Sequence, residues 1–87
     1  MGIGAQVSVG NGRVFDREGL SFGGRYRFSA VDSEAESVEL AVWTDDTEAV
    51  HVKLHVGETF DFEDQTWRLD EIDDEGRRWY ATLTRVA

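Results

Sequence analysis

The sequence predicts an all-β fold: a single small antiparallel β-sandwich or partly open barrel of about seven short strands, with no substantial helix. The first observation is the alternation of apolar and polar side chains along residues 50–56, which resumes at residues 60–62 and is typical of strands with one buried face. The second is that turn-forming residues recur about every eight to twelve positions. The third is that no segment carries a long helical stripe of apolar residues.

The first quarter of the chain predicts two short strands around a glycine turn. Residues 7–9 alternate between apolar and polar side chains, Gly10-Asn11-Gly12 tolerates positive φ, and Val14-Phe15 follows. This pattern fits a short hairpin, or two strands that meet at a corner.

Residues 20–29 combine apolar side chains with a pair of glycines. We expect residues 20–22 to form a brief apolar element that Gly23-Gly24 ends, before an alternating strand begins at Arg25. In that strand the two aromatic residues point to one side and the two arginines to the other. We predict that the aromatic side of this strand faces the core, as do the aromatic residues of the later strands. The aromatic residues predicted to lie in the core are Tyr26, Phe28, Phe60, Phe62, Trp67 and Trp79.

Residues 32–40 have some helical character, because acidic residues cluster there and Asp32 or Ser33 could cap a first turn. The segment is too short to bury an apolar stripe, and apolar residues already alternate from position 38 onward. We therefore predict a strand over residues 38–44 that pairs, through a polar loop, with an antiparallel strand over residues 49–56.

The last third of the chain predicts a strand with an irregularity and then a final hairpin. Leu69 and Ile72 differ in parity, so either a bulge lies near Asp70-Glu71 or the strand ends there. Residues 73–76 form a turn whose glycine suits the left-handed conformation, and residues 78–86 form the last strand.

Length and charge restrict the function. A chain of 87 residues without cysteine has one small core and no disulfides or thiolate ligands, so we expect one domain over residues 1–87. The net charge of −9 opposes binding to nucleic acid or to an anionic membrane. Twelve acidic and five basic residues lie in residues 44–87, which favours a basic protein partner. We find no leader and no membrane-spanning apolar segment, so a cytoplasmic protein is expected.

The motifs for catalysis or metal binding are weak. His51 and His55 flank Lys53, but strand positions four apart are separated by about 13 Å, too far to share a metal ion. The acidic clusters at residues 63–64 and 70–75 leave adventitious calcium binding open, although they do not match a calcium-loop pattern. No nucleophile elbow or phosphate loop occurs. We predict that the protein is not an enzyme and has no cofactor and no metal site.

Aromatic residues on outer faces of strands are the best candidates for a binding site. Trp43 alternates with the apolar residues of its strand and Tyr80 alternates with Trp79, so both are expected to point outward. An exposed tryptophan on a sheet is a typical interface anchor. The residues predicted to contact a protein partner are Trp43, His51, Lys53, His55 and Tyr80.

Two functions from different classes are consistent with this pattern. The first is a non-catalytic protein-interaction module, in its sharper form an inhibitor or immunity-like protein that docks a basic partner. The alternative is a small ligand-binding β-barrel or accessory catalyst with an apolar pocket lined by Phe60, Phe62, Trp67 and Trp79. A homodimer through an edge strand, or through the outer face carrying Trp43, also fits, because the chain has no proline to blunt its edges.

The segment from Val50 to Val86 contains HVKLHVGETF, QTWRLDEI, a charged turn and WYATLTRVA. It resembles a small all-β domain family of unknown function found in actinobacteria. The matching residues are a turn glycine, strand aromatics and alternating aliphatics, so the resemblance implies the fold and no catalytic residue. Eight of the nine basic residues are arginine, which suits a GC-rich genome.

Overall fold

The computed structural model describes residues 2–12, 14–17, 19–31, 34–76 and 78–87, and in these residues every regular element is a β-strand. The prediction of an all-β fold is confirmed, with eight strands in this part of the chain against the seven or so expected. No helix there could cross a membrane. The strands are β1 (Gln6–Gly10), β2 (Val14–Arg17), β3 (Leu20–Phe28), β4 (Ser37–Trp43), β5 (Val50–His55), β6 (Thr59–Phe62), β7 (Gln65–Asp74) and β8 (Trp79–Arg85).

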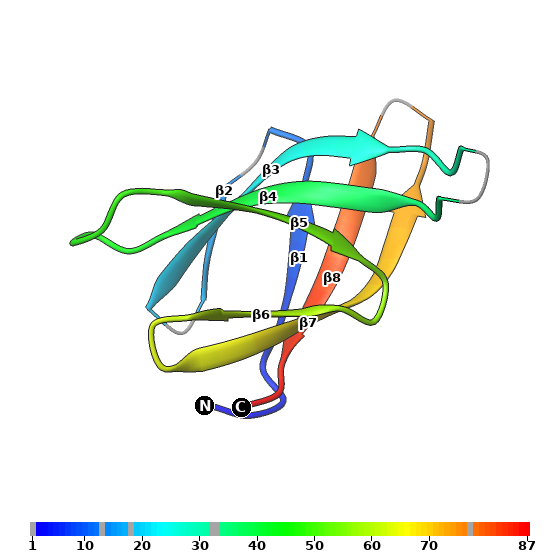
Figure 1. Ribbon diagram of the computed structural model, residues 1–87. Helices are drawn as coiled ribbons and strands as arrows, with labels where there is room; N and C mark the ends of the chain where they lie inside the picture. Colours follow the sequence, from blue (N-terminus) through cyan, green and yellow to red (C-terminus); the bar gives the residue numbers. More distant parts are fainter. Residues whose placement is uncertain (1, 13, 18, 32–33, 77) are drawn as a thin grey trace.

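The strands form two four-stranded antiparallel sheets that pack as a sandwich (Figure 1). The terminal sheet has the order β1-β8-β7-β6, and the central sheet has the order β2-β3-β4-β5. The two chain ends lie side by side because the first strand pairs with the last (Figure 1). Of the two predicted architectures, the sandwich is the one observed.

The turn at residues 10–12 carries the chain from one sheet to the other. Asn11 N donates to Trp79 O in β8 at 3.3 Å, and Gly12 N donates to Gly24 O in β3 at 3.1 Å. Gly12 has a φ of 71°, which glycine adopts without a steric penalty. β1 and β2 therefore meet at a corner, which is one of the two predicted arrangements, and do not form the hairpin that was the other.

The core lies between the sheets and draws alternating residues from both. Trp67 and Phe22 are fully buried, and their rings meet edge to face with centroids 5.1 Å apart. Phe60 and Trp79 are also buried, and Phe62 is half-buried against this cluster. The prediction of these aromatic residues as core is confirmed.

β3 runs without a break through Gly23-Gly24, where an interruption was predicted. Its pairing with β4 shifts between Gly24 and Tyr26, which makes Arg25 the extra residue of a β-bulge. A shift of one residue turns the side chains that follow to the other face of the sheet. Tyr26 is therefore 54% exposed and Phe28 40% exposed, and the prediction that they lie in the core is wrong.

Gly24 lets β3 approach the turn at residues 10–12 closely. A Cβ at this position would overlap the carbonyl oxygen of Gly10 and lie 2.9 Å from the ring of Trp79.

Beyond the bulge, Arg27 points toward the terminal sheet. Its Nε donates to Glu36 Oε2 at 2.6 Å, and its Nη1 lies 3.1 Å from Asp74 Oδ2 in β7. The bulge thus places a cation between the ends of the two sheets.

The predicted pairing of β4 with β5 is confirmed. The described part of the helix-like segment contains no helix, and Asp32 and Ser33 lie outside the described residues. Along β5, Leu54 is buried and Val52 half-buried, but Val50 is exposed. The buried face predicted for this segment is therefore limited to Val52 and Leu54, because Val56 on the far side of β5 is exposed as well.

The irregularity predicted near Asp70-Glu71 is a bulge. The pairing of β7 with β8 shifts between Leu69 and Glu71, so Asp70 is the extra residue. Ile72 consequently packs against the core, half-buried. The turn that follows contains Gly76 with a φ of 81°, as the sequence predicted.

Candidate functional site

The outer face of the central sheet carries four of the five predicted contact residues. Trp43 ends β4, and His51, Lys53 and His55 alternate along β5 with residues that point inward. The β3 bulge adds two exposed aromatic side chains, which lie beside the outward-pointing residues of β4. We use the term outer face for Tyr26, Phe28, Trp43, His51, Lys53 and His55.

Tyr80 does not belong to the outer face. β8 lies in the terminal sheet, and its neighbours Trp79 and Ala81 are buried between the sheets. Tyr80 therefore points away from the sandwich on the opposite side. The alternation along β8 correctly indicated that Tyr80 points outward, but it carried no information on which sheet contains the strand.

Trp43 is half-buried because its ring lies against the backbone of β3. A Cβ at Gly23 would lie 3.3 Å from the Cζ3 atom of the indole, so the missing side chain makes room for the ring. Such a pair, with an aromatic ring covering a glycine on the neighbouring strand, stabilises sheets. The indole therefore has both a structural contact and a solvent-facing part.

Lys53 and His55 of the outer face, and Arg25 next to it, lie close to carboxylates of the same chain. Arg25 Nε lies 2.9 Å from Glu39 Oε2. Lys53 Nζ lies 3.8 Å from Glu34 Oε1, and His55 Nε2 lies 3.6 Å from the same oxygen. The outer face is consequently not a basic surface, despite its lysine and histidines.

Glu58 adds a further carboxylate beside β5. The backbone N–H of His55 donates to Glu58 Oε1 at 2.7 Å, and His55 Nδ1 lies 3.1 Å from that oxygen. These contacts, the backbone hydrogen bond first, hold the pKa of Glu58 below its usual value of 4.5. Glu58 therefore stays ionised beside the histidine down to low pH.

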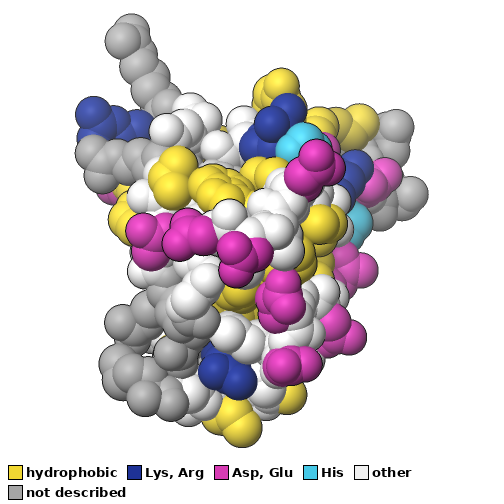
Figure 2. All heavy atoms as spheres, turned by 90° about the vertical axis from the view of Figure 1, so that its left-hand side faces the viewer, with side chains coloured by type: hydrophobic (Ala, Val, Ile, Leu, Met, Phe, Trp, Pro, Cys, Tyr) yellow, Lys and Arg dark blue, Asp and Glu magenta, His cyan; other side chains and the backbone are white. Residues whose placement is uncertain are grey.

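Acidic side chains gather on the side of the sandwich where the β4–β5 and β6–β7 turns lie (Figure 2). We use the term acidic end for five exposed residues of these turns. Trp43 is the last residue of β4, so the outer face leads directly into the acidic end. The five residues are Asp45, Asp46, Glu48, Glu63 and Asp64.

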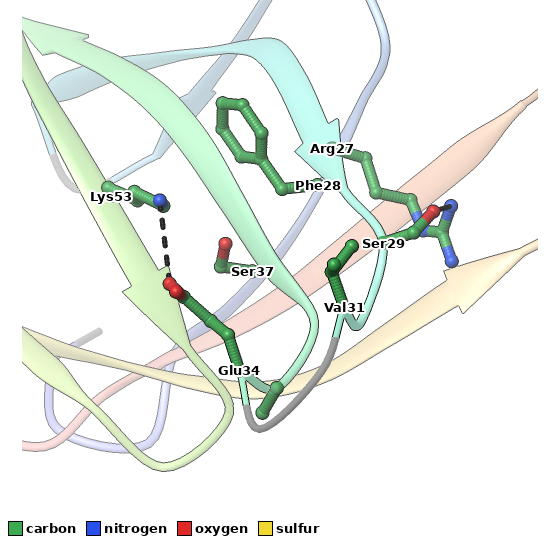
Figure 3. Close-up of a pocket in the computed structure, with 8 residues that line it drawn as sticks. Arg27, Phe28, Ser29, Val31, Glu34, Ser37 and Lys53 are labelled. Carbon is green, nitrogen blue, oxygen red and sulfur yellow. Dashed lines mark hydrogen bonds and ion pairs between the residues drawn. The ribbon is translucent and has the colours of Figure 1, made fainter.

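A pocket of about 570 Å3 opens at the opposite end of the outer face (Figure 3). Phe28 and Val31 line it together with Glu34, Ser37 and Lys53. Sequence reasoning gave Ser37 and Glu34 no role. Neither residue belongs to a recognisable motif, and only the pairing of β4 with β3 and β5 brings Ser37 to the pocket.

The pocket that the alternative function requires is not formed by the aromatic residues predicted for it. Phe60, Phe62, Trp67 and Trp79 pack in the core, where the alternative function needs them to line a pocket. No three His, Asp or Glu side chains in the described ranges come together as a metal site.

The fold and the outer face define a small β-sandwich domain with exposed aromatic residues on one sheet. Residues 4–87 match the model of a family of unknown function, DUF6406, so the chain belongs to this family. The match extends well beyond residues 50–86, on which the resemblance in the sequence was based. No curated protein and no solved structure matches the chain.

Proposed function

We propose that this domain is a non-catalytic protein-interaction module that docks a basic protein through its outer face and acidic end. The observation that carries the proposal is the exposure of Tyr26 and Phe28 on the same face of the central sheet as Trp43. Aromatic side chains gathered on one exposed surface are typical of interface anchors. The β3 bulge turns Tyr26 and Phe28 toward solvent, whereas an uninterrupted register would point both rings into the core.

Charge supports a basic partner. The chain carries a net charge of −9, and Arg25, Lys53 and His55 already lie close to carboxylates of the same chain. The exposed carboxylates of the acidic end therefore dominate the field next to Trp43. Such a field accelerates association with a basic protein and weakens as salt is added. An inhibitor or immunity-like protein that covers a basic surface is the sharper form of this proposal.

A second copy of the chain is the other occupant considered. β5 is an edge strand of the central sheet, and an edge strand can pair with another chain. A homodimer through this edge, or through the outer face carrying Trp43, stays a prediction. The cytoplasmic location and the actinobacterial origin suggested by the sequence stay predictions as well.

Affinity capture from cells that express the protein tests the proposal. Wild type is compared with Tyr26→Ser and Trp43→Ala, and Tyr80→Ser on the terminal sheet is the matched control. We expect wild type and Tyr80→Ser to retain a basic protein that the other two variants lose. Because Tyr26 is exposed, its variant should unfold at the same temperature as wild type, and loss of capture then reports on the surface.

Binding of the purified partner gives the quantitative result. Tyr26→Ser should weaken it about tenfold or more, and added salt should weaken the wild-type complex. Equal capture by all four proteins, or a partner bound without salt dependence, contradicts the proposal. Sedimentation of the purified wild type and of Tyr26→Ser, without a partner, tests whether a second copy of the chain binds the outer face. A wild-type dimer that the Tyr26→Ser variant does not form would assign this face to self-association.

A further inference from the structure

The pocket beside Phe28 has the size of a small-molecule site. Its volume of about 570 Å3 falls within the range of roughly 300 to 1,000 Å3 that ligand pockets occupy. Phe28 and Val31 form its apolar part, while Glu34, Ser37 and Lys53 form its polar part (Figure 3). The inference that follows goes beyond the proposed function and does not depend on it.

Ser37 lies in this pocket with an unsatisfied hydroxyl. The residue is 1% exposed, and its Oγ has no hydrogen-bond partner among the described residues. Its neighbours across the sheet are Phe28 in β3 and His55 in β5. The hydroxyl points into the space between the Phe28 ring and Glu34 (Figure 3). A buried hydroxyl without a hydrogen bond is unfavourable, so a polar group that enters the pocket is stabilised there.

Lys53 supplies a cation at the same pocket. Its ammonium lies 4.6 Å from the centre of the Phe28 ring, a cation–π contact that holds it in place. Its distance of 3.8 Å to Glu34 Oε1 exceeds that of a hydrogen bond. The ion pair therefore leaves the N–H groups of the ammonium open to a closer acceptor.

The other two charged residues that line the pocket, Arg27 and Glu34, leave room for a ligand carboxylate beside Lys53. The guanidinium of Arg27 is held by Glu36 and Asp74 and turns away from the pocket (Figure 3). The Glu34 side chain is 62% exposed, and its contacts with Lys53 and His55 are long, at 3.8 and 3.6 Å. Such a carboxylate moves at small cost. Glu34 thus places one carboxylate near Lys53, while Ser37 stays unsatisfied among the described residues.

We propose that the pocket binds a carboxylate attached to a hydrophobic group. The carboxylate displaces Glu34 and accepts hydrogen bonds from Lys53 Nζ and Ser37 Oγ, and the hydrophobic group packs on Phe28 and Val31. Hydrogen bonds from an ammonium to a carboxylate are strong, which gives the charged ligand its advantage over a neutral one. The same chemistry occurs in a free organic acid and in the C-terminal residue of a peptide.

An NMR titration of the whole chain with phenylpropionate tests the proposal, and phenylpropionamide is the neutral ligand of the same shape. We expect the amide signals of Phe28, Ser37 and Lys53 to shift, with affinity for the acid about tenfold higher than for the amide. A peptide that ends in phenylalanine, free or amidated at its C-terminus, distinguishes the two sources. Tighter binding of the free peptide than of phenylpropionate identifies a peptide terminus as the ligand.

Three variants test the role of each polar group. Lys53→Met should weaken binding of phenylpropionate about tenfold, and Ser37→Ala about threefold. Glu34→Gln should strengthen it, because the competing carboxylate is gone. Ser37→Ala should fold normally, since the hydroxyl it removes makes no hydrogen bond. Arg68→Met, which also replaces a cation by methionine, and Ser8→Ala lie at exposed positions of the terminal sheet and should leave the affinity unchanged.

Several results would overturn the proposal. One is equal affinity for the acid and its amide, and another is weaker binding of the acid by Glu34→Gln. Absence of shifts at Ser37 and Lys53 up to about 10 mM ligand, where even weak sites fill, is a third. Tighter binding of phenylethylamine than of phenylpropionate would assign the pocket to cations, which also overturns it.

Discussion

The two β-bulges of this chain have opposite consequences for its surface. In β7 the extra residue is Asp70, and the shift turns Ile72 toward the core. In β3 the extra residue is Arg25, and the shift turns Tyr26 and Phe28 into solvent. One insertion therefore completes the core of the sandwich, and the other opens the aromatic surface on which the proposed function rests.

The contacts that hold the two bulges also differ. Asp70 accepts hydrogen bonds from Thr84 Oγ1 of β8 and from Arg68 Nε, the latter at 2.6 Å. In β3 the side chain of Arg25 makes one ion pair, and the close approach of Gly24 to the turn at residues 10–12 adds a backbone constraint. The β7 bulge therefore depends on side-chain contacts, whereas the β3 bulge depends mainly on the space that a glycine leaves.

Gly24→Ala should have the largest effect, because it removes that space. The new Cβ would overlap the carbonyl group of Gly10, and the backbone can move away only by separating β3 from the turn. We expect the free energy of unfolding to fall by about 3 kcal/mol, measured by urea denaturation. In the matched control Gly23→Ala, the Cβ meets ring atoms of Trp43 at 3.3 Å, and the loss should be about 1 kcal/mol. Equal losses would show that the glycine does not fix the bulge.

Arg27→Met should have an intermediate effect, because the β3 bulge aims this side chain at the terminal sheet. The side chain is 22% exposed and its guanidinium contacts Glu36 and Asp74, so its loss should lower the unfolding free energy by about 1 kcal/mol. Arg25→Met removes a more exposed pair and should cost less than about 0.5 kcal/mol. Denaturation in low and high salt should show the difference shrinking as salt rises. A larger loss in Arg25→Met would place the support of the bulge in its own side chain.

The β7 bulge gives the smallest effect, a change in the pH dependence of stability. The hydrogen bond from Thr84, together with the contacts of Arg68, holds the pKa of Asp70 below its usual value of 3.8. A carboxyl group with a lowered folded-state pKa stabilises the protein above its unfolded pKa, and this stabilisation is lost as the pH falls through the folded pKa.

Unfolding free energies measured from about pH 5 down to pH 2 check this expectation. The wild type should lose stability more steeply over this range than Asp70→Asn. Thr84→Val, which keeps the carboxyl group and removes its hydrogen-bond donor, should show the same shallower slope. A wild-type slope in Thr84→Val would mean that this hydrogen bond does not lower the pKa of Asp70.

Much of the fold could be predicted because alternation reports on the local backbone. The strand pair of residues 38–56, the β7 bulge and the turn at Gly76 all left a signal within a few residues. The β3 bulge left only the glycine pair before it, which predicted a break in the strand and not a bulge. Tyr26 and Phe28 are apolar and suit the core as well as an outer face, and the close approach of Gly24 to the turn at residues 10–12, far away in the chain, left no local signal.

The candidate site divides in the same way. Alternation alone placed Trp43, His51, Lys53 and His55 on the outward side of their strands, because a strand turns successive side chains to opposite faces. It could not show that Tyr80 belongs to the other sheet. Nor could it bring Ser37, Lys53 and Glu34 to one pocket. Sheet order, cross-strand register and long-range approach settled those points, since they depend on hydrogen bonds and packing between segments that are distant in sequence.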